Sequence, residues 1–573
     1  MSDYSKTGMK KGLTRYGDDD FAHYIRTAFI KGMGYTDDAI SKPIVGITNT
    51  YSAYNACHAT APQLIDAIKR GVMLAGGLPV EFPIISLHES FAYPTSMYLR
   101  NLMSMDAEEM IRAQPMDSVV LVGGCDKTVP ALLMGAASAG VPAILEVTGP
   151  MLVGSHEGER LGACTDCRRF WAQYRAGEID SSDIERITDQ LVPSAGTCGV
   201  MGTASTMAIL GEALGMMLPG GATIPAVLGD RYRHGEVTGA RAVEMAKAKG
   251  PTPDLVMTEA AFRNAQRLLH AVGGSTNAIV HLAAIAGRLG IDLDLDTFDE
   301  LGHDTPVLVD LKPSGQNYME DLNKAGGLAP VFREISHLLH LTTMTVSGKT
   351  LGENIEAYPK PFPQDVVRPF DTPLSPAGGM AVLRGNLAPD GAVIKHAAAS
   401  PELMTHTGKA VVFENLDDLA ARIDEPELDV TADSVLVLRN AGPKGAPGMP
   451  EAGYIPIPKK LGQQGVKDMV RISDARMSGT AFGSIVLHIA PESAAGGPLA
   501  LVHTGDEICL DVENRKLELL VDDGELERRR DEWSPPRPHE GSERGYAKLF
   551  QDTVTQAPEG CDFDFLRAVK GLE

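Results

Sequence analysis

A cysteine, an aspartate and a lysine stand side by side in this chain, as Cys125, Asp126 and Lys127, after two glycines and a short apolar run at residues 118–122. A β-branched run that ends in glycines and is followed by a helix-like segment predicts strand, tight turn and helix, where open α/β sheets bind ligands. A thiolate suits iron or zinc, whereas a carboxylate suits magnesium. The three neighbours therefore indicate metal-assisted chemistry, with two different metals, on an oxygen-rich substrate.

The cysteines divide by their local sequence. Cys57, Cys125 and Cys198 lie in polar or glycine-rich turns beside predicted helix starts, where backbone N–H groups can support a thiolate. One such cysteine alone is more often a small buried hydrophobic residue, but three in similar turns favour metal ligands. The total of seven is odd and widely spread, which is atypical of a disulfide framework.

Cys164 and Cys167 form a Cys-x-x-Cys pair, a motif found in zinc sites and redox centres. The chain has no second pair of this kind, and the strand that precedes a thioredoxin-like motif is missing. A structural or incidental role is therefore the favoured interpretation. Cys509 and Cys561 are expected to be plain thiols.

Composition excludes several classes of protein. The formal net charge of -23 and the pI near 5.1 argue against nucleic acid or an anionic membrane as partner. The N-terminal segment lacks the apolar core of a signal peptide, and no run of about 18 apolar residues occurs. We expect a cytoplasmic protein without a membrane partner, whose anionic small substrate needs local cations or metals.

The 573 residues suffice for two or three domains. Strand-like and helix-like segments alternate in the first two thirds, which predicts an α/β domain at residues 1–376 with a largely parallel sheet flanked by helices. Prolines cluster between residues 358 and 376 and indicate a linker. Short strand-like segments with frequent turns predict a β-rich, barrel-like domain at residues 377–573. Two glycine-rich loops at residues 442–451 and 473–480 carry no nucleotide-binding fingerprint.

Five motifs together resemble the dihydroxy-acid and sugar-acid dehydratase family, which includes phosphogluconate dehydratase. They are GCDKT at 124–128, GTCGVMGTASTM at 196–207, GGSTN at 273–277, GPKG at 442–445 and DARMSGT at 474–480. The likeness runs from about residue 34 to residue 565 in the expected order. Five long motifs in register are a far stronger signal than one short pattern.

The resemblance implies a hydro-lyase with an iron–sulfur cluster and a magnesium ion between two domains. Carried over by matching motifs, the cluster ligands are Cys57, Cys125 and Cys198, and the magnesium ligands are Glu89, Asp126, Lys127 and Glu451. The lysine of this family is typically carbamylated, which turns a repelled ammonium into an oxygen ligand. Ser478 matches the family's proposed base, and Thr480 is its substrate-positioning neighbour.

The reaction implied is dehydration of a 2,3-dihydroxy carboxylic acid to a 2-keto-3-deoxy acid. The metal ions would act as Lewis acids on the carboxylate, on the C2 hydroxyl and on the C3 oxygen. Glu89, and the sequence of residues 474–479, resemble the sugar-acid branch, which acts on aldonates such as arabinonate, xylonate, gluconate or galactonate. The alternative is the dihydroxy-acid dehydratase of branched-chain amino-acid synthesis, or a promiscuous enzyme that does both.

Further features follow from the same resemblance. It favours [2Fe–2S] over [4Fe–4S] and a homodimer or homotetramer. His58 and His88 depart from the usual pattern beside Cys57 and Glu89, and either reshape the pocket or are harmless.

Two other classes fit less well. An aconitase-type hydro-lyase lacks the magnesium that the Asp126–Lys127 pair and the carboxylates Glu89 and Glu451 indicate. A non-enzymatic iron–sulfur or zinc protein would leave Lys127 and Ser478 without a role.

Overall fold

The computed structural model describes residues 6–539 and 541–568. Its first sheet has four strands in the order β2 (Leu78–Pro83), β1 (Ile44–Asn49), β3 (Ser118–Gly123) and β4 (Ala143–Val147). Every pairing is parallel. β3 and β4 are buried along their whole length, as expected of a parallel sheet covered on both faces. The predicted α/β architecture is confirmed.

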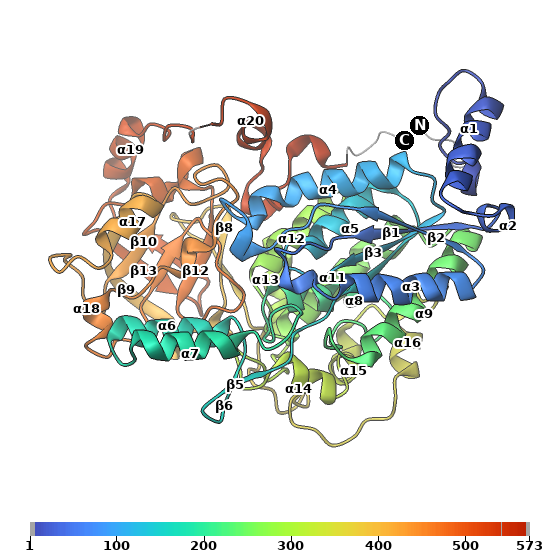
Figure 1. Ribbon diagram of the computed structural model, residues 1–573. Helices are drawn as coiled ribbons and strands as arrows, with labels where there is room; N and C mark the ends of the chain where they lie inside the picture. The colour runs from blue at the N-terminus through green and yellow to red at the C-terminus, as the bar shows by residue number, and fades with distance from the viewer. Residues whose placement is uncertain (1–5, 540, 569–573) are drawn as a thin grey trace.

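Helices cover both faces of this sheet (Figure 1). α3 (Ala61–Leu74) and α9 (Gly229–Ala248) pack together on one face, and α4 (Ser96–Ala113) and α5 (Thr128–Ala139) on the other. Gly71 lets α3 and α9 approach closely, because a Cβ atom there would lie 1.8 Å from the Glu236 carbonyl oxygen.

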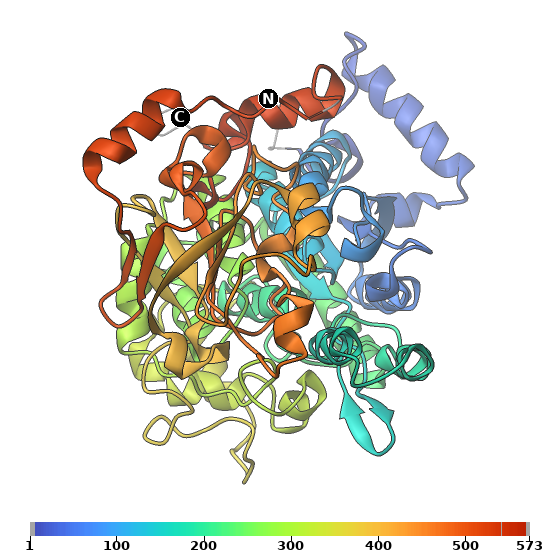
Figure 2. The same ribbon diagram turned by 90° about the vertical axis from the view of Figure 1, so that its left-hand side faces the viewer.

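The second sheet has eight strands that curve into a barrel, seen with its strands toward the viewer in Figure 2. Its four central strands, at residues 405–413, 435–438, 471–473 and 485–490, are mutually parallel, and the outer strands are antiparallel. A bridge between Arg384 and Lys516 joins the first and last strands and closes the ring. This confirms the predicted barrel. The strands in sheet order are β14 (Lys516–Leu519), β13 (Glu507–Asp511), β9 (Thr405–Phe413), β10 (Val435–Leu438), β11 (Arg471–Ser473), β12 (Ile485–Ala490), β8 (Gly391–Ile394) and β7 (Ala381–Leu383).

Segments cross between the two sheets. α6 (Thr165–Ala176) and α7 (Ser181–Leu191) precede the proline-rich segment, yet they lie along the barrel in Figure 1. Arg175 of α6 pairs with Asp424 at 2.8 Å. In the other direction, α20 (Gly545–Thr553) returns to α4, where the Tyr546 hydroxyl donates to the Tyr98 carbonyl oxygen at 2.6 Å. The chain thus interlocks the two sheets.

The N-terminal helix α1 (Asp19–Gly32) stands at the edge of the molecule, apart from both sheets (Figures 1 and 2). Tyr24 is 67% exposed and Phe29 74% exposed, so this helix presents aromatic side chains outward. Among the described residues, no helix combines the length and the apolar character that a membrane crossing requires.

Candidate active site

The predicted site residues of the first sheet all follow the carboxyl ends of its strands. Cys57 comes after β1, Glu89 after β2, and Cys125, Asp126 and Lys127 directly after β3. Parallel strands bring their carboxyl ends to one edge, so ligands from distant parts of the chain meet there.

A bridge beyond β4 brings the third predicted cysteine to the same edge. Pro150 and Thr197 form a parallel bridge, and the residue after Thr197 is Cys198. The turn before Cys125 fits beneath this bridge only because residue 124 is glycine. A Cβ atom on Gly124 would lie 1.9 Å from the Thr148 hydroxyl oxygen and 3.1 Å from a Thr197 methyl carbon.

Two of the three predicted cluster cysteines lie close together. Ligand atoms of Cys57 and Cys125, together with a ring nitrogen of His88, all lie within 4.8 Å of one another. The Cys198 sulfur falls outside this 4.8 Å group and lies 3.7 Å from the sulfur of Cys164. A hydrogen bond with Cys125 and complete burial raise the pKa of the Cys57 thiol well above its ordinary value. The Cys57 thiol therefore holds its proton until a metal ion replaces it.

Hydrogen bonds from the backbone to His58 fix the turn that carries Cys125. The Nε2 atom of His58 accepts hydrogen bonds from the backbone N–H groups of Gly124 and Cys125, both at 3.0 Å. Its Nδ1 lies 2.8 Å from the Thr50 carbonyl oxygen, to which it donates. Burial lowers the pKa of His58 to about 4, so the ring is neutral and can accept on one nitrogen. This residue orients a predicted cluster ligand.

Three carboxylates converge beside the thiols. One oxygen each of Glu89, Asp126 and Glu451 lies within 4.8 Å of the others. The fully buried Lys127 ammonium pairs with Asp126 and lies 3.9 Å from Glu89 and 4.0 Å from Glu451. The Lys127 ammonium thus lies among three carboxylate groups that could together bind a metal cation.

Arg476 is the second buried cation of this cluster. Its guanidinium pairs with Glu451, lies 3.3 Å from Glu89, and donates to the Thr95 hydroxyl at 2.8 Å. Burial opposes ionisation of Glu89, but Arg476 and Lys127 outweigh it and hold the pKa of Glu89 well below its usual range. Burial and the nearby Glu89 raise the pKa of Glu451, although Arg476 opposes the shift. The two buried cations therefore favour ionisation of Glu89 more than ionisation of Glu451.

Ser478 and Thr480 lie in the loop after β11 that also carries Arg476. A Cβ atom on Gly202 would lie 2.8 Å from the Thr480 methyl carbon and 3.7 Å from the Cys198 Cβ atom, which places this loop beside a predicted cluster cysteine. The hydroxyl oxygens of Ser478 and Thr480 lie 2.8 Å apart, and the Thr480 N–H donates to the Ser478 oxygen at 3.4 Å. Close packing against the first half of the chain fixes the loop, since a Cβ atom on Gly479 would lie 2.5 Å from the Ser275 side chain. The Thr165 hydroxyl also donates to the Thr480 carbonyl oxygen at 2.9 Å.

Two models of one protein family match most of this chain. The N-terminal model of dihydroxy-acid/6-phosphogluconate dehydratases matches residues 42–354, and the C-terminal model of the same enzymes matches residues 365–561. The chain belongs to the dihydroxy-acid/6-phosphogluconate dehydratase family.

Relatives within this dehydratase family differ in the acid that they are named for. The L-arabonate dehydratase of Azospirillum brasilense is 50% identical, with 97% of each chain covered. The 6-deoxy-6-sulfo-D-gluconate dehydratase of Pseudomonas putida is 46% identical, covering 93% of this chain and 92% of that protein. The dihydroxy-acid dehydratase of Syntrophobacter fumaroxidans is 39% identical, covering 96% and 98%.

The residues present fit the two metal groups that this dehydratase family uses. Soft sulfur atoms gather on one side and hard carboxylate oxygens on the other, which matches the preferences of iron and magnesium. Three half-buried carboxylates against two fully buried cations leave one negative charge in the cluster. Carbamylation of Lys127 would remove one cation and add one anion, which strengthens the cluster's need for a divalent ion.

Several members of the site were not singled out from the sequence. Arg476 and Asn277 stand inside two of the family motifs, but their types alone do not indicate a role. The Asn277 amide donates to Glu451 at 3.3 Å. Thr95 donates to Glu89 at 2.7 Å. Cys164, for which the sequence favours a structural or incidental role, lies beside Cys198, and this contact depends on the path of the chain after β4.

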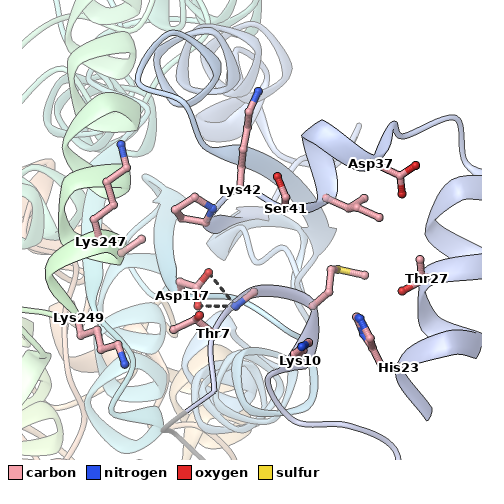
Figure 3. Close-up of a pocket in the computed structure, with 15 residues that line it drawn as sticks. Thr7, Lys10, His23, Thr27, Asp37, Ser41, Lys42, Asp117, Lys247 and Lys249 are labelled. Carbon is pink, nitrogen blue, oxygen red and sulfur yellow. Dashed lines mark hydrogen bonds between the residues drawn. The ribbon is translucent and has the colours of Figure 1, made fainter. Parts of the chain in front are cut away.

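A cavity of about 660 Å³ lies elsewhere, beneath α1, and Figure 3 shows its lining. Lys42, Lys247 and Lys249 border it, but their ammonium groups do not converge on one point. This cavity contains none of the thiol or carboxylate ligands described above.

Replacing Arg476 by methionine should destabilise the protein by about 3–5 kcal/mol, because Glu89 and Glu451 would keep their buried charge without this partner. The loss of stability should be largest above the usual carboxyl pKa, because Glu89 ionises at lower pH in the folded state than in the unfolded state. The difference in stability between the variant and the wild type should decrease as the pH falls. Urea unfolding at a series of pH values measures it. Arg233→Met is the matched control, because Arg233 pairs with Asp230 on the surface with 74% of its side chain exposed. It should change stability by at most about 1 kcal/mol; an equal loss in both variants would contradict the assigned role of Arg476.

Proposed function

We propose that this protein dehydrates aldonic acids to 2-keto-3-deoxy acids with an iron–sulfur cluster and magnesium. The observation that carries the proposal is the meeting of the thiol group and the three-carboxylate cluster at one sheet edge, with Ser478 reaching the same region. The higher identity to enzymes named for sugar acids, 50% and 46% against 39%, supports aldonates over dihydroxyisovalerate.

The substrate poses two chemical problems. The proton at C2 is weakly acidic, and the hydroxyl at C3 is a poor leaving group. When bound, the cluster and the magnesium ion supply the Lewis acidity that both problems require. Cys57, Cys125 and Cys198 would hold the cluster. The magnesium ligands would be Glu89, Asp126, carbamylated Lys127 and Glu451.

Ser478 is the proposed base that removes the C2 proton. A serine hydroxyl is a weak base, so its deprotonated form needs stabilisation. The N–H and hydroxyl groups of Thr480 both lie near the Ser478 oxygen and can donate to it, which favours the anionic form. Thr480 therefore serves as the positioning neighbour of the base.

We also propose a [2Fe–2S] cluster, which the likeness to the sugar-acid branch favours. Mössbauer spectroscopy of protein labelled with iron-57 distinguishes it from [4Fe–4S]. Reduced thiols are needed to bind either cluster, which supports a cytoplasmic location. A homodimer or homotetramer is supported by the exposed aromatic residues of α1, and light scattering gives the subunit number.

Ser478→Ala should retain the visible absorption of the cluster and lose dehydration by at least about 100-fold, since the base is removed while the metal ligands remain. A 2-keto-acid assay beside an absorption spectrum measures both. Ser542→Ala is a control on another loop, where the hydroxyl donates to the His539 carbonyl oxygen at 2.6 Å. Retained turnover in Ser478→Ala would rule out Ser478 as the base.

Lys127→Ala should lose magnesium and keep iron, because it removes one proposed oxygen ligand without changing the thiols. Metal analysis after anaerobic purification gives both contents in one sample. An intact-mass increase of about 44 Da on Lys127 of the wild-type protein, the mass of carbon dioxide, would identify the carbamate directly. Unchanged magnesium content in the variant would contradict the carbamate ligand.

The substrate class is tested with cluster-loaded protein, magnesium and a panel of pentonates, hexonates and 2,3-dihydroxyisovalerate. Higher kcat/KM for an aldonate than for dihydroxyisovalerate is expected. The reverse order would assign the protein to branched-chain amino-acid synthesis. Absence of turnover with every acid would contradict the proposed activity.

A further inference from the structure

His88 lies between the two ligand groups, and neither proposed ligand set includes it. One of its ring nitrogens is within 4.8 Å of the sulfur atoms of both Cys57 and Cys125. The next residue, Glu89, belongs to the carboxylate cluster. A single backbone segment therefore faces the thiols with one side chain and the carboxylates with the next.

The backbone explains this division. His88 has extended dihedral angles, φ -130° and ψ 130°, at the start of the short 3-10 turn Glu89–Phe91. Side chains of successive residues in extended chain point to opposite sides. His88 and Glu89 can thus serve separate groups although they are adjacent in sequence.

A backbone contact sets the tautomer of the His88 ring. The Ser90 N–H donates to Nδ1 of His88 at 3.2 Å, so Nδ1 is an acceptor and carries no proton. In a neutral imidazole the proton then resides on Nε2. Nε2, the ring nitrogen that Ser90 leaves free, is consequently an N–H donor near the sulfur atoms.

The same contact argues against His88 as an iron ligand. A histidine that ligates a metal through Nε2 keeps a proton on Nδ1 and donates it to an acceptor. Here Nδ1 faces a donor, the Ser90 N–H. Ligation through Nε2 would require an imidazolate ring without the usual support.

We propose that His88 donates an Nε2–H hydrogen bond to a sulfur atom of the cluster, either a cysteine thiolate or an inorganic sulfide. This inference rests on the proposed cluster site. Such a bond stabilises the more negative, reduced cluster and raises its reduction potential. It also withdraws electron density from the sulfur, which makes the iron a stronger Lewis acid toward the C3 oxygen. His88 is a positioning and tuning residue in this role.

Three variants test the proposal on anaerobically reconstituted protein. His88→Leu removes the donor, whereas His88→Gln places an amide N–H near the former Nε2 position. His303→Gln is the matched control, because His303 is a histidine whose side chain is 60% exposed. The midpoint potential is measured by redox titration followed by EPR, with iron content determined on each sample.

The expected result is a lower midpoint potential for His88→Leu with unchanged iron content, a potential near the wild-type value for His88→Gln, and no change for His303→Gln. Equal shifts in the leucine and glutamine variants would indicate a packing role and overturn the proposal. An unshifted potential in His88→Leu would overturn it as well, and so would lost iron, which would point to ligation. If wild-type protein took up no cluster, the proposed cofactor itself would fail, and that outcome is distinct from all of these.

Discussion

Buried charge at the junction of the two sheets is the constraint on which the active site depends. Glu89, Asp126 and Lys127 come from the carboxyl edge of the parallel sheet, and Glu451 and Arg476 come from the barrel. Charges buried in a protein are costly unless they are paired. The three groups of the first half carry one excess negative charge, whereas Glu451 and Arg476 of the barrel balance each other. Arg476 also lies 3.3 Å from Glu89, so the barrel supplies a cation to the half that lacks one.

The proposed ligands are sorted by chemical type within a short distance. Cys57 and Cys125 gather with His88 on one side and the carboxylate oxygens on the other, and the boundary runs through consecutive residues at 88–89 and 125–126. Extended chain and tight turns send neighbouring side chains in different directions, so two metal groups with opposite preferences can be held by the same loops. A substrate with adjacent hydroxyl groups and a carboxylate can then contact both groups at once.

Interlocking segments give this junction its rigidity. α6 and α7 leave the first half of the chain to lie along the barrel, and α20 returns from the second half to pack on α4. The Thr165 contact to the backbone of Thr480 ties the start of α6 to the loop of the proposed base. Packed elements of this kind hold reacting groups in place more precisely than surface loops do.

The amino-acid sequence by itself determined the parallel sheet, the barrel-like second half and the motifs that carry the ligands, because strand periodicity and glycine turns are local properties. It also predicted Cys125, Asp126 and Lys127 at a strand end. β8 and β14 have only four residues each, too few for periodicity to mark them clearly.

Only the tertiary structure decided which groups meet. Arg476 lies 387 residues from Glu89 in sequence, and Cys164 reaches Cys198 only because the chain after β4 folds back on Thr197. The direction of the Ser90 N–H toward His88, which sets the ring's tautomer, is likewise a matter of backbone geometry. A residue's type limits the bonds that it can make, but the path of the whole chain determines its partners. That path depends on packing and charge pairing between residues far apart in sequence.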